Sequence, residues 1–71
     1  MSKADLRWKQ YYETGQYRGF KKIREQKYRL SGQTHITFSD GKREIFAAGI
    51  FKEAALLKIF DQIDQELLTN H

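Results

Sequence analysis

The residues whose chemistry is most concentrated are the lysines and arginines between Tyr17 and Leu30. This segment holds six of the 13 basic residues of the chain and one of its nine acids. The net charge of +4 is therefore a local excess on an otherwise nearly neutral chain. A concentrated positive field attracts polyanions and is the first feature expected of a nucleic-acid-binding protein. We expect contacts to phosphates, of DNA rather than RNA, from Arg18, Lys21, Lys22, Arg24, Lys27 and Arg29.

Two interpretations of this basic segment are open. In an extended chain successive side chains point to opposite sides, so each side would carry three cations, with Tyr17, Phe20 and Tyr28 available to stack on bases. Alternatively, the charges protect an edge strand from pairing with other chains. Edge protection needs only one or two charges, so the excess favours binding. The expected sides are Arg18, Lys22 and Arg24 on one, and Lys21, Lys27 and Arg29 on the other.

Residues that could catalyse a reaction or hold a metal are few. His71 is the last residue, and His35 has no Cys or Asp at a spacing that would build a nucleophilic triad. Asp61 and Asp64 lie one helical turn apart while Glu66 turns away, which is typical of a solvated helix face. The chain has no cysteine, which excludes disulfides and cysteine zinc sites. We expect a non-enzymatic protein without cofactor or metal.

Length and composition favour one small folded domain spanning residues 1–71. The chain is 39% hydrophobic and 14% aromatic, enough for a small core. Neither a signal peptide nor a charge-free apolar segment of membrane-spanning length is visible, so no membrane contact is expected. The absence of cysteine fits a reducing compartment, and we expect the protein in the cytoplasm.

The elements that must position the basic segment begin with a helix. Ser2 is the expected N-cap, with Asp5 completing a capping box, and the helix should end near Thr14 before Gly15. Helical spacing gathers one apolar face, which we interpret as core packing rather than a platform for bases. That face carries Ala4, Trp8, Tyr11 and Tyr12.

The basic segment itself should be a strand, or two pieces of one, bent near Glu25 and Gln26. Phe20, Tyr28 and Leu30 share one parity whereas Ile23 has the other. One flat strand cannot bury all four on one side, so we expect a bulge or break between Ile23 and Tyr28. A turn follows at residues 31–33.

An Asp40-Gly41 dipeptide between two β-like runs predicts a hairpin with a type I′ turn. Centring the hairpin there pairs Ser39 with Lys42, Phe38 with Arg43, Ile36 with Ile45 and His35 with Phe46. One face then carries Ile36, Phe38, Ile45, Ala47, Gly49 and Phe51, and the other carries His35, Thr37, Glu44, Phe46, Ala48 and Ile50.

Residues 52–68 have the longest helical periodicity in the chain. Their apolar stripe is Leu56, Ile59, Phe60, Ile63 and Leu67. The expected fold is α+β, with an N-terminal helix, three antiparallel strands and a long C-terminal helix packed on the sheet. We expect the first helix to cover Phe46, Ala48 and Ile50, and a second copy of the chain is the alternative.

Tyr17-Arg18-Gly19-Phe20, followed by a hairpin, Ala48-Gly49-Ile50-Phe51 and a helix opening Lys52-Glu53-Ala54-Ala55, resembles a known architecture. It is similar to the DNA-binding domains of plant ethylene-response factors and the arm-type binding domains of tyrosine recombinases. The resemblance implies a sheet that enters the major groove, with contacts from Arg18 and from Lys21 and Arg24. The resemblance also implies that the groove-facing side of the second and third strands is rich in arginine and tryptophan. The sequence departs from that pattern, because this side carries Thr37, Phe46, Ala48 and Ile50.

These observations predict a small DNA-binding or DNA-associated regulator with weak sequence preference. The alternative is a protein-interaction module or inhibitor whose basic strand docks on an acidic partner, with homodimerisation through Phe46, Ala48 and Ile50 as one form of it.

Overall fold

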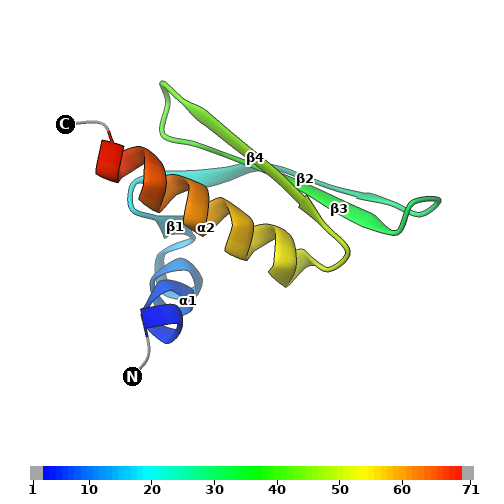
Figure 1. Ribbon diagram of the computed structural model, residues 1–71, viewed down its shortest axis with the longest axis horizontal. Coiled ribbons are helices and arrows are strands. Elements are labelled where there is room, and N and C mark those ends of the chain that lie inside the picture. The colour runs from blue at the N-terminus through cyan, green and yellow to red at the C-terminus, as the bar shows by residue number, and fades with distance from the viewer. Residues whose placement is uncertain (1–2, 70–71) are drawn as a thin grey trace.

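A computed structural model describes residues 3–69 of the chain, and the side chains of residues 6–68. The elements are α1 (Lys3–Thr14), β1 (Gln16–Tyr17), β2 (Phe20–Tyr28), β3 (Gln33–Ser39), β4 (Glu44–Gly49) and α2 (Lys52–Thr69). The strands form one antiparallel sheet in the order β1-β2-β3-β4 (Figure 1). The α+β class and the C-terminal helix are confirmed, but the sheet has four strands rather than three. Ser2, the expected N-cap, lies outside the described residues. Within residues 3–69, neither helix is long and apolar enough to cross a bilayer.

The core lies between α2 and one face of the sheet. Ile36 and Phe38 of β3 are fully buried there, and Ala47 of β4 joins them. Each large side chain removed from water contributes roughly 1.5–3 kcal/mol, so this stripe is the main stabilising contact of the fold. The predicted apolar face of the C-terminal helix is confirmed, because the fully buried residues of α2 are Ala55, Leu56, Ile59, Phe60 and Ile63.

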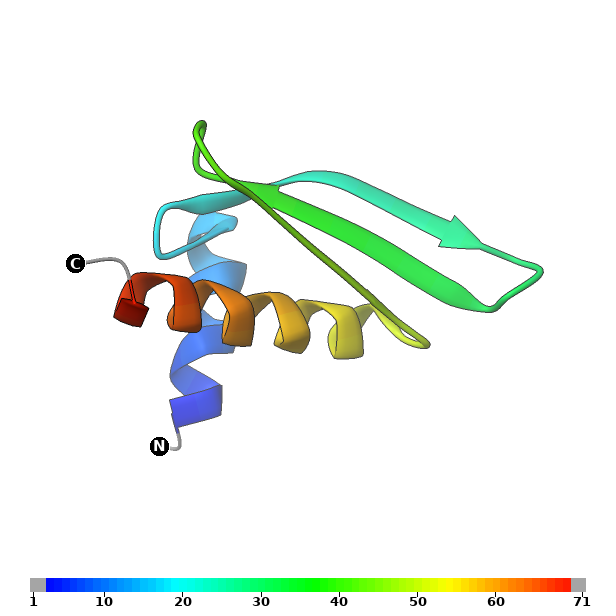
Figure 2. The same cartoon turned by 45° about the horizontal axis from the view of Figure 1, so that its top comes forward.

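The first helix packs on the same side of the sheet as α2, as Figure 2 shows. Trp8 and Tyr11 lie against Phe60, with ring centroids 5.3 and 5.8 Å away. The expectation that α1 covers the opposite face is therefore wrong. The short strand β1 pairs only with the start of β2, at the edge of the sheet. That connection holds α1 next to α2, and it leaves Phe46 and Ile50 53% and 69% exposed.

The bulge in β2 lies earlier than predicted. The register between β2 and β3 shifts between Lys22 and Arg24, at Ile23 itself. Phe20, ahead of the shift, is buried in the core, while Ile23 is half exposed. Tyr28 is exposed as well, because the bulge places it on the face opposite the helices, and Leu30 is exposed in the turn after β2. A bulge of one residue exchanges the faces of the side chains that follow it.

The β3–β4 hairpin has a wider loop than predicted. Ser39 pairs with Glu44 and Ile36 with Ala47, a register two residues away from the expected one. The reason lies in Asp40, whose carboxylate accepts hydrogen bonds from the backbone N–H groups of Lys42 (2.9 Å) and Arg43 (2.8 Å). Because side chains alternate with a period of two, the shift leaves the predicted faces of both strands unchanged. Phe51 is the exception, since it follows β4 and is 68% exposed.

Asp64 joins three segments of the chain at the end of α2. Its oxygens accept hydrogen bonds from Tyr17 Oη (2.7 Å), Arg18 Nη1 (2.9 Å) and Arg7 Nη1 (3.2 Å). Arg7 also donates to Asp61 at 2.8 Å. Burial favours the neutral acid, but the three donors outweigh it and hold the pKa of Asp64 below its ordinary value. The acidic helix face predicted to be solvated thus fastens α1 and β1 to α2.

Acid should weaken this fold through Asp64. A carboxylate whose pKa is lowered by folding contributes stability above its unfolded pKa and loses that stability as the pH falls through its folded pKa. We expect the free energy of unfolding from urea titrations to be constant between about pH 7 and 5 and to fall below about pH 4. In Asp64→Asn the unfolding free energy should be lower at pH 7 and depend less on pH. A wild-type acid dependence in that variant would contradict the assignment.

Gly49 should tolerate no side chain. A Cβ there would lie 2.9 Å from the backbone nitrogen of Ala55 and 3.0 Å from the Cβ of Ala54, so α2 would have to move. We expect Gly49→Ala to destabilise the protein by about 1–3 kcal/mol in thermal or urea unfolding. Gly41→Ala is the comparison, because its Cβ would meet nothing within 4 Å and only its φ of +96° is unfavourable. If Gly49→Ala lowered the stability by no more than Gly41→Ala does, the result would contradict close packing of α2 on β4.

Candidate nucleic-acid interface

The face of the sheet opposite α2 is covered by neither helix. Cross-strand partners share a face, so the registers define its members from the strand residues that alternate with the core. We call this set the open face: Lys21, Ile23, Arg24, Gln26 and Tyr28 of β2, Gln33, His35, Thr37 and Ser39 of β3, and Glu44, Phe46 and Ala48 of β4. Two of its cations, Lys21 and Arg24, come from β2, and its one acid, Glu44, lies on β4. The positive charge is therefore on the β2 side.

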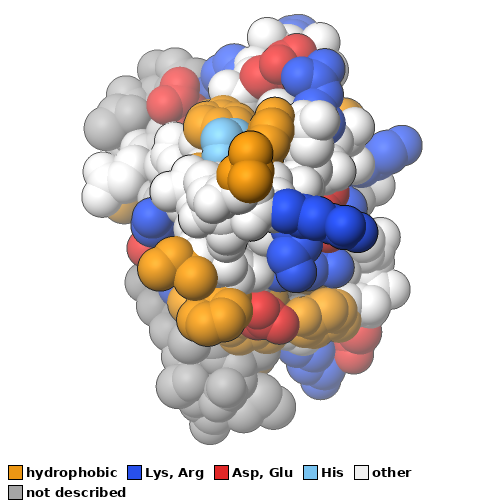
Figure 3. All heavy atoms as spheres, turned by 90° about the vertical axis from the view of Figure 1, so that its right-hand side faces the viewer, with side chains coloured by type: hydrophobic (Ala, Val, Ile, Leu, Met, Phe, Trp, Pro, Cys, Tyr) orange, Lys and Arg blue, Asp and Glu red, His pale blue; other side chains and the backbone are white. Residues whose placement is uncertain are grey.

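A row of three rings crosses the open face. The centroid of His35 lies 4.6 Å from that of Tyr28 and 5.3 Å from that of Phe46, both in edge-on geometry. Tyr28 and Phe46 are 42% and 53% exposed. Figure 3 looks onto the end of the sheet with the β2–β3 turn and shows a histidine ring against hydrophobic side chains, with lysines and arginines beside them. Exposed rings of this kind can contact sugars and bases.

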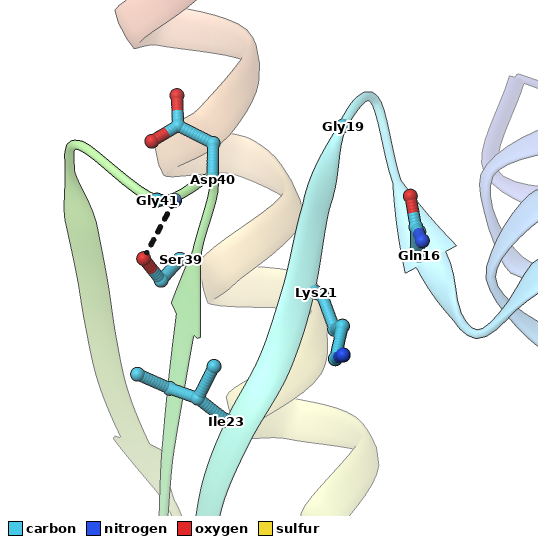
Figure 4. Close-up of a pocket in the computed structure, with 7 residues that line it drawn as sticks. All are labelled: Gln16, Gly19, Lys21, Ile23, Ser39, Asp40 and Gly41. Carbon is cyan, nitrogen blue, oxygen red and sulfur yellow. Dashed lines mark hydrogen bonds between the residues drawn. The ribbon is translucent and has the colours of Figure 1, made fainter.

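A hollow lies at the other end of the open face, between the β1–β2 and β3–β4 turns. Its volume is about 330 Å³, and its walls are Gln16, Gly19, Lys21, Ile23, Ser39, Asp40 and Gly41. Figure 4 shows Lys21, Ile23 and Ser39 on the viewer's side of their strands, with α2 behind the sheet, and the carboxylate of Asp40 pointing away from the hollow.

The chemistry of this hollow suits an anion at one end only. The ammonium of Lys21 and the amide of Gln16 are donors that a phosphate oxygen can accept from. Asp40 is held ionised, because hydrogen bonds from the backbone N–H groups of Arg43 and Lys42 keep its pKa below its ordinary value. An approaching phosphate is therefore favoured at Lys21 and repelled at the Asp40 rim.

The six predicted site residues do not form one row. Lys21 and Arg24 lie on the open face, since Lys21 pairs with Ser39 and Arg24 with Thr37. Lys22 and Lys27 pair with Phe38 and Thr34 and thus lie on the side of α2. Arg29 follows β2 in the exposed turn. The predicted division of the six cations between the two sides of the strand is wrong, because the bulge at Ile23 changes which side the following residues face.

Two of the six cations are engaged inside the molecule. Arg18 has a φ of +50° and donates to Asp64. Lys22 Nζ lies 2.6 Å from Glu25 Oε1, a hydrogen bond that raises the pKa of Lys22 and lowers that of Glu25. Neither cation is free to bind a phosphate without losing its present partner.

The other four cations have no such partner. Among the side chains of residues 6–68, no carboxylate lies within ion-pair distance of Lys21, Arg24, Lys27 or Arg29. Of these four, Lys21 and Arg24 share the open face and Arg29 lies at its end. These three cations are the phosphate contacts that the geometry supports.

Sequence reasoning missed the ring row. It placed His35 and Phe46 on one face, which is confirmed, although His35 pairs with Ala48 rather than with Phe46; it treated that face as covered by α1. Of the three rings expected to be available for stacking, Tyr28 is exposed on the open face, where the bulge places it, but Tyr17 and Phe20 are buried in the core, so the expectation is wrong for those two. The signal available in the sequence was that the predicted hairpin places His35 and Phe46 on the same face. His71 lies outside the described residues, and within residues 3–69 no three acids or histidines gather as a metal site would require.

No protein-family model, curated protein or solved structure matches this chain. The resemblance to sheet-type DNA-binding domains therefore stays a prediction, and the candidate interface is defined by its own geometry: two unpaired cations, a row of rings and a hollow on a sheet face that neither helix covers.

Proposed function

We propose that this protein is a non-enzymatic DNA-binding or DNA-associated regulator that binds through the open face. The observation that carries the proposal is the position of Lys21 and Arg24 on a sheet face that neither helix covers, with no carboxylate partner for either cation among the side chains of residues 6–68. Unpaired cations are the side chains that can release counterions from DNA at no cost to the fold.

The contacts follow the direction of β2. Lys21 supplies a donor at the hollow, Arg24 lies near the middle of the strand, and Arg29 lies in the turn beyond its end. The ring row provides apolar contact to sugars and bases next to this line of cations. Glu44 on β4 repels phosphates, so the nucleic-acid backbone is confined to the β2 half of the face. Phosphate contacts dominate this arrangement, and they carry little sequence information.

Fewer phosphates are engaged than the six cations suggested. About two to three contacts correspond to a slope of roughly −2 to −3 in a plot of log affinity against log salt. Four to six contacts would give roughly −3 to −5. The salt dependence therefore separates binding by the open face from binding by the whole basic segment.

The open face can be tested with two charge-matched double variants. Lys21→Gln/Arg24→Gln removes two cations from the open face, and Lys22→Gln/Lys27→Gln removes two from the opposite side of the same strand. In fluorescence anisotropy with a short labelled duplex, we expect the first variant to lose about tenfold or more in affinity and about 2 units of salt slope. The control should lose less than about threefold.

Equal losses in the two variants would mean that net charge rather than the open face governs binding, and would overturn the proposal. Affinity that does not change with salt would overturn it as well. Folding of both variants is checked by circular dichroism.

A second candidate function is homodimerisation through the apolar part of β4 and the segment after it. It is favoured by the exposure of Phe46, at 53%, and Ile50, at 69%. Light scattering after size exclusion distinguishes the candidates. A dimer that does not bind DNA and that becomes a monomer in Phe46→Ser/Ile50→Ser supports the second, and a monomer that binds the duplex supports the first.

A further inference from the structure

The two outer strands of the sheet, β2 and β4, differ in how many of their outward backbone groups have partners in the rest of the chain. On β4, outward-facing carbonyl oxygens already have partners from α2. Gln62 Nε2 donates to Phe46 O at 3.0 Å, and Lys58 Nζ donates to Ala48 O at 2.9 Å. Two carbonyl oxygens that a further strand would need as acceptors are thereby occupied, and covering an edge is a known way of protecting it.

Within residues 3–69, the β2 edge has no such cover along most of its length. The short strand β1 pairs only with Phe20 and Lys21. From the bulge to Tyr28, β2 has a neighbour on its β3 side alone. Figure 2 shows this part of β2 extending away from both helices as the outer strand of the sheet.

The hydrogen-bonding phase of the sheet identifies which peptide groups of β2 face outward. Asp40 N donates to Arg43 O at 3.3 Å and starts the β3–β4 ladder. Peptide groups alternate in direction along an antiparallel ladder, so those of Phe46 and Ala48 point away from β3, in agreement with their bonds to α2. By the same alternation across β3, the peptide groups of Gln26 and Tyr28 point toward β3. The peptide groups of Glu25 and Lys27 point outward, away from the sheet.

A second hollow lies next to these outward groups, on the side of α2. Its volume is also about 330 Å³, at the lower end of the range for ligand pockets, roughly 300–1,000 Å³. Apolar surface comes from Ile50 and Phe51, which are 69% and 68% exposed. The walls are Glu25, Lys27, Thr34, Ile50, Phe51, Lys52 and Glu53. A strand added to β2 would direct alternate side chains toward this side of the sheet.

The charges around this edge are mainly positive. Lys22, Arg24, Lys27 and Lys52 surround it, against Glu25 and Glu53. Glu25 is already neutralised, since Lys22 lies 2.6 Å and Lys52 3.7 Å from its Oε1. The cations would repel the same edge of a second copy of the chain, so the edge favours an acidic partner over self-pairing.

We propose that the edge of β2 between Ile23 and Tyr28 binds an extended acidic segment of another protein as an additional strand. The backbone groups of Glu25 and Lys27 form the pairing hydrogen bonds, as in other cases of strand addition. Acidic side chains of the partner point to the side of α2, where Lys27 and Lys52 line the hollow, and its apolar side chains alternate with them on the other side of the added strand. This site is separate from the open face and does not depend on DNA binding.

The test uses a fluorescein-labelled peptide of about seven residues that alternates glutamate with valine, the residue types that the charge and the sheet edge require. We expect saturable binding in fluorescence anisotropy. A peptide with lysine in place of glutamate should bind at least tenfold more weakly. A glutamate–valine peptide methylated on alternate backbone nitrogens, so that one edge cannot donate, should also lose at least tenfold while keeping its charge.

Two variants of the protein separate backbone pairing from charge. Lys27→Gln removes the charge and keeps the outward N–H, whereas Lys27→Pro removes both, and proline is tolerated on an edge strand where the N–H is not used by the sheet. We expect Lys27→Pro to bind the peptide at least fivefold more weakly than Lys27→Gln. Lys21→Gln/Arg24→Gln, which tests the open face, should keep most of the peptide affinity.

Three results would overturn strand addition. The first is equal affinity of the methylated and unmethylated peptides for the wild-type protein, which requires no variant to fold. The second is equal affinity of a folded Lys27→Pro and Lys27→Gln. The third is no binding of the glutamate–valine peptide at millimolar concentration.

Discussion

The burial of α2 against β3 is the contact on which the rest of the structure depends. Leu56, Ile59 and Ile63 lose all contact with water there, together with Ile36 and Phe38. In a chain of 71 residues little other apolar surface is available, so this one helix face must hold the sheet together. Phe60 extends the same contact to α1 and β1, because its ring is in contact with Trp8 and Tyr11 of α1 and with Tyr17 of β1. Asp64, one turn further on, adds polar bonds to the same segments.

Placing both helices on one side determines what the protein can present to a partner. One face of the sheet keeps its water contact, and with it a row of rings and two unpaired cations. The edge of β2 beyond Lys21 stays open as well, while two outward carbonyl oxygens of the β4 edge accept hydrogen bonds from Lys58 and Gln62. Both candidate binding surfaces thus follow from one packing arrangement. They use different groups of β2: its side chains on the open face bind the nucleic acid, and its backbone groups at the edge bind the added strand.

The bulge at Ile23 divides the basic segment between these surfaces. Ahead of it, Lys21 faces the open side and Lys22 faces α2. After it, Arg24 faces the open side again rather than following Lys22. Arg18 is drawn away to Asp64 by the left-handed conformation of the β1–β2 turn. A segment with a formal excess of +5 therefore acts as several small sites, which lowers the expected number of phosphate contacts but creates a cationic edge.

The local sequence was sufficient for the features that depend on short-range periodicity. It determined α2 with its buried face, the end of α1 before Gly15, and which residues of β3 and β4 point into the core, since the period of two survives a register error of two residues. The side chain of Asp40 decided the width of the hairpin loop, and that required its bonds to Lys42 and Arg43. Only the tertiary structure decided which side α1 occupies, because the aromatic face of α1 would have been satisfied by either apolar surface. It also decided which cations are free, because Asp64 reaches Arg18 across 46 residues of chain, a distance over which no local pattern carries information.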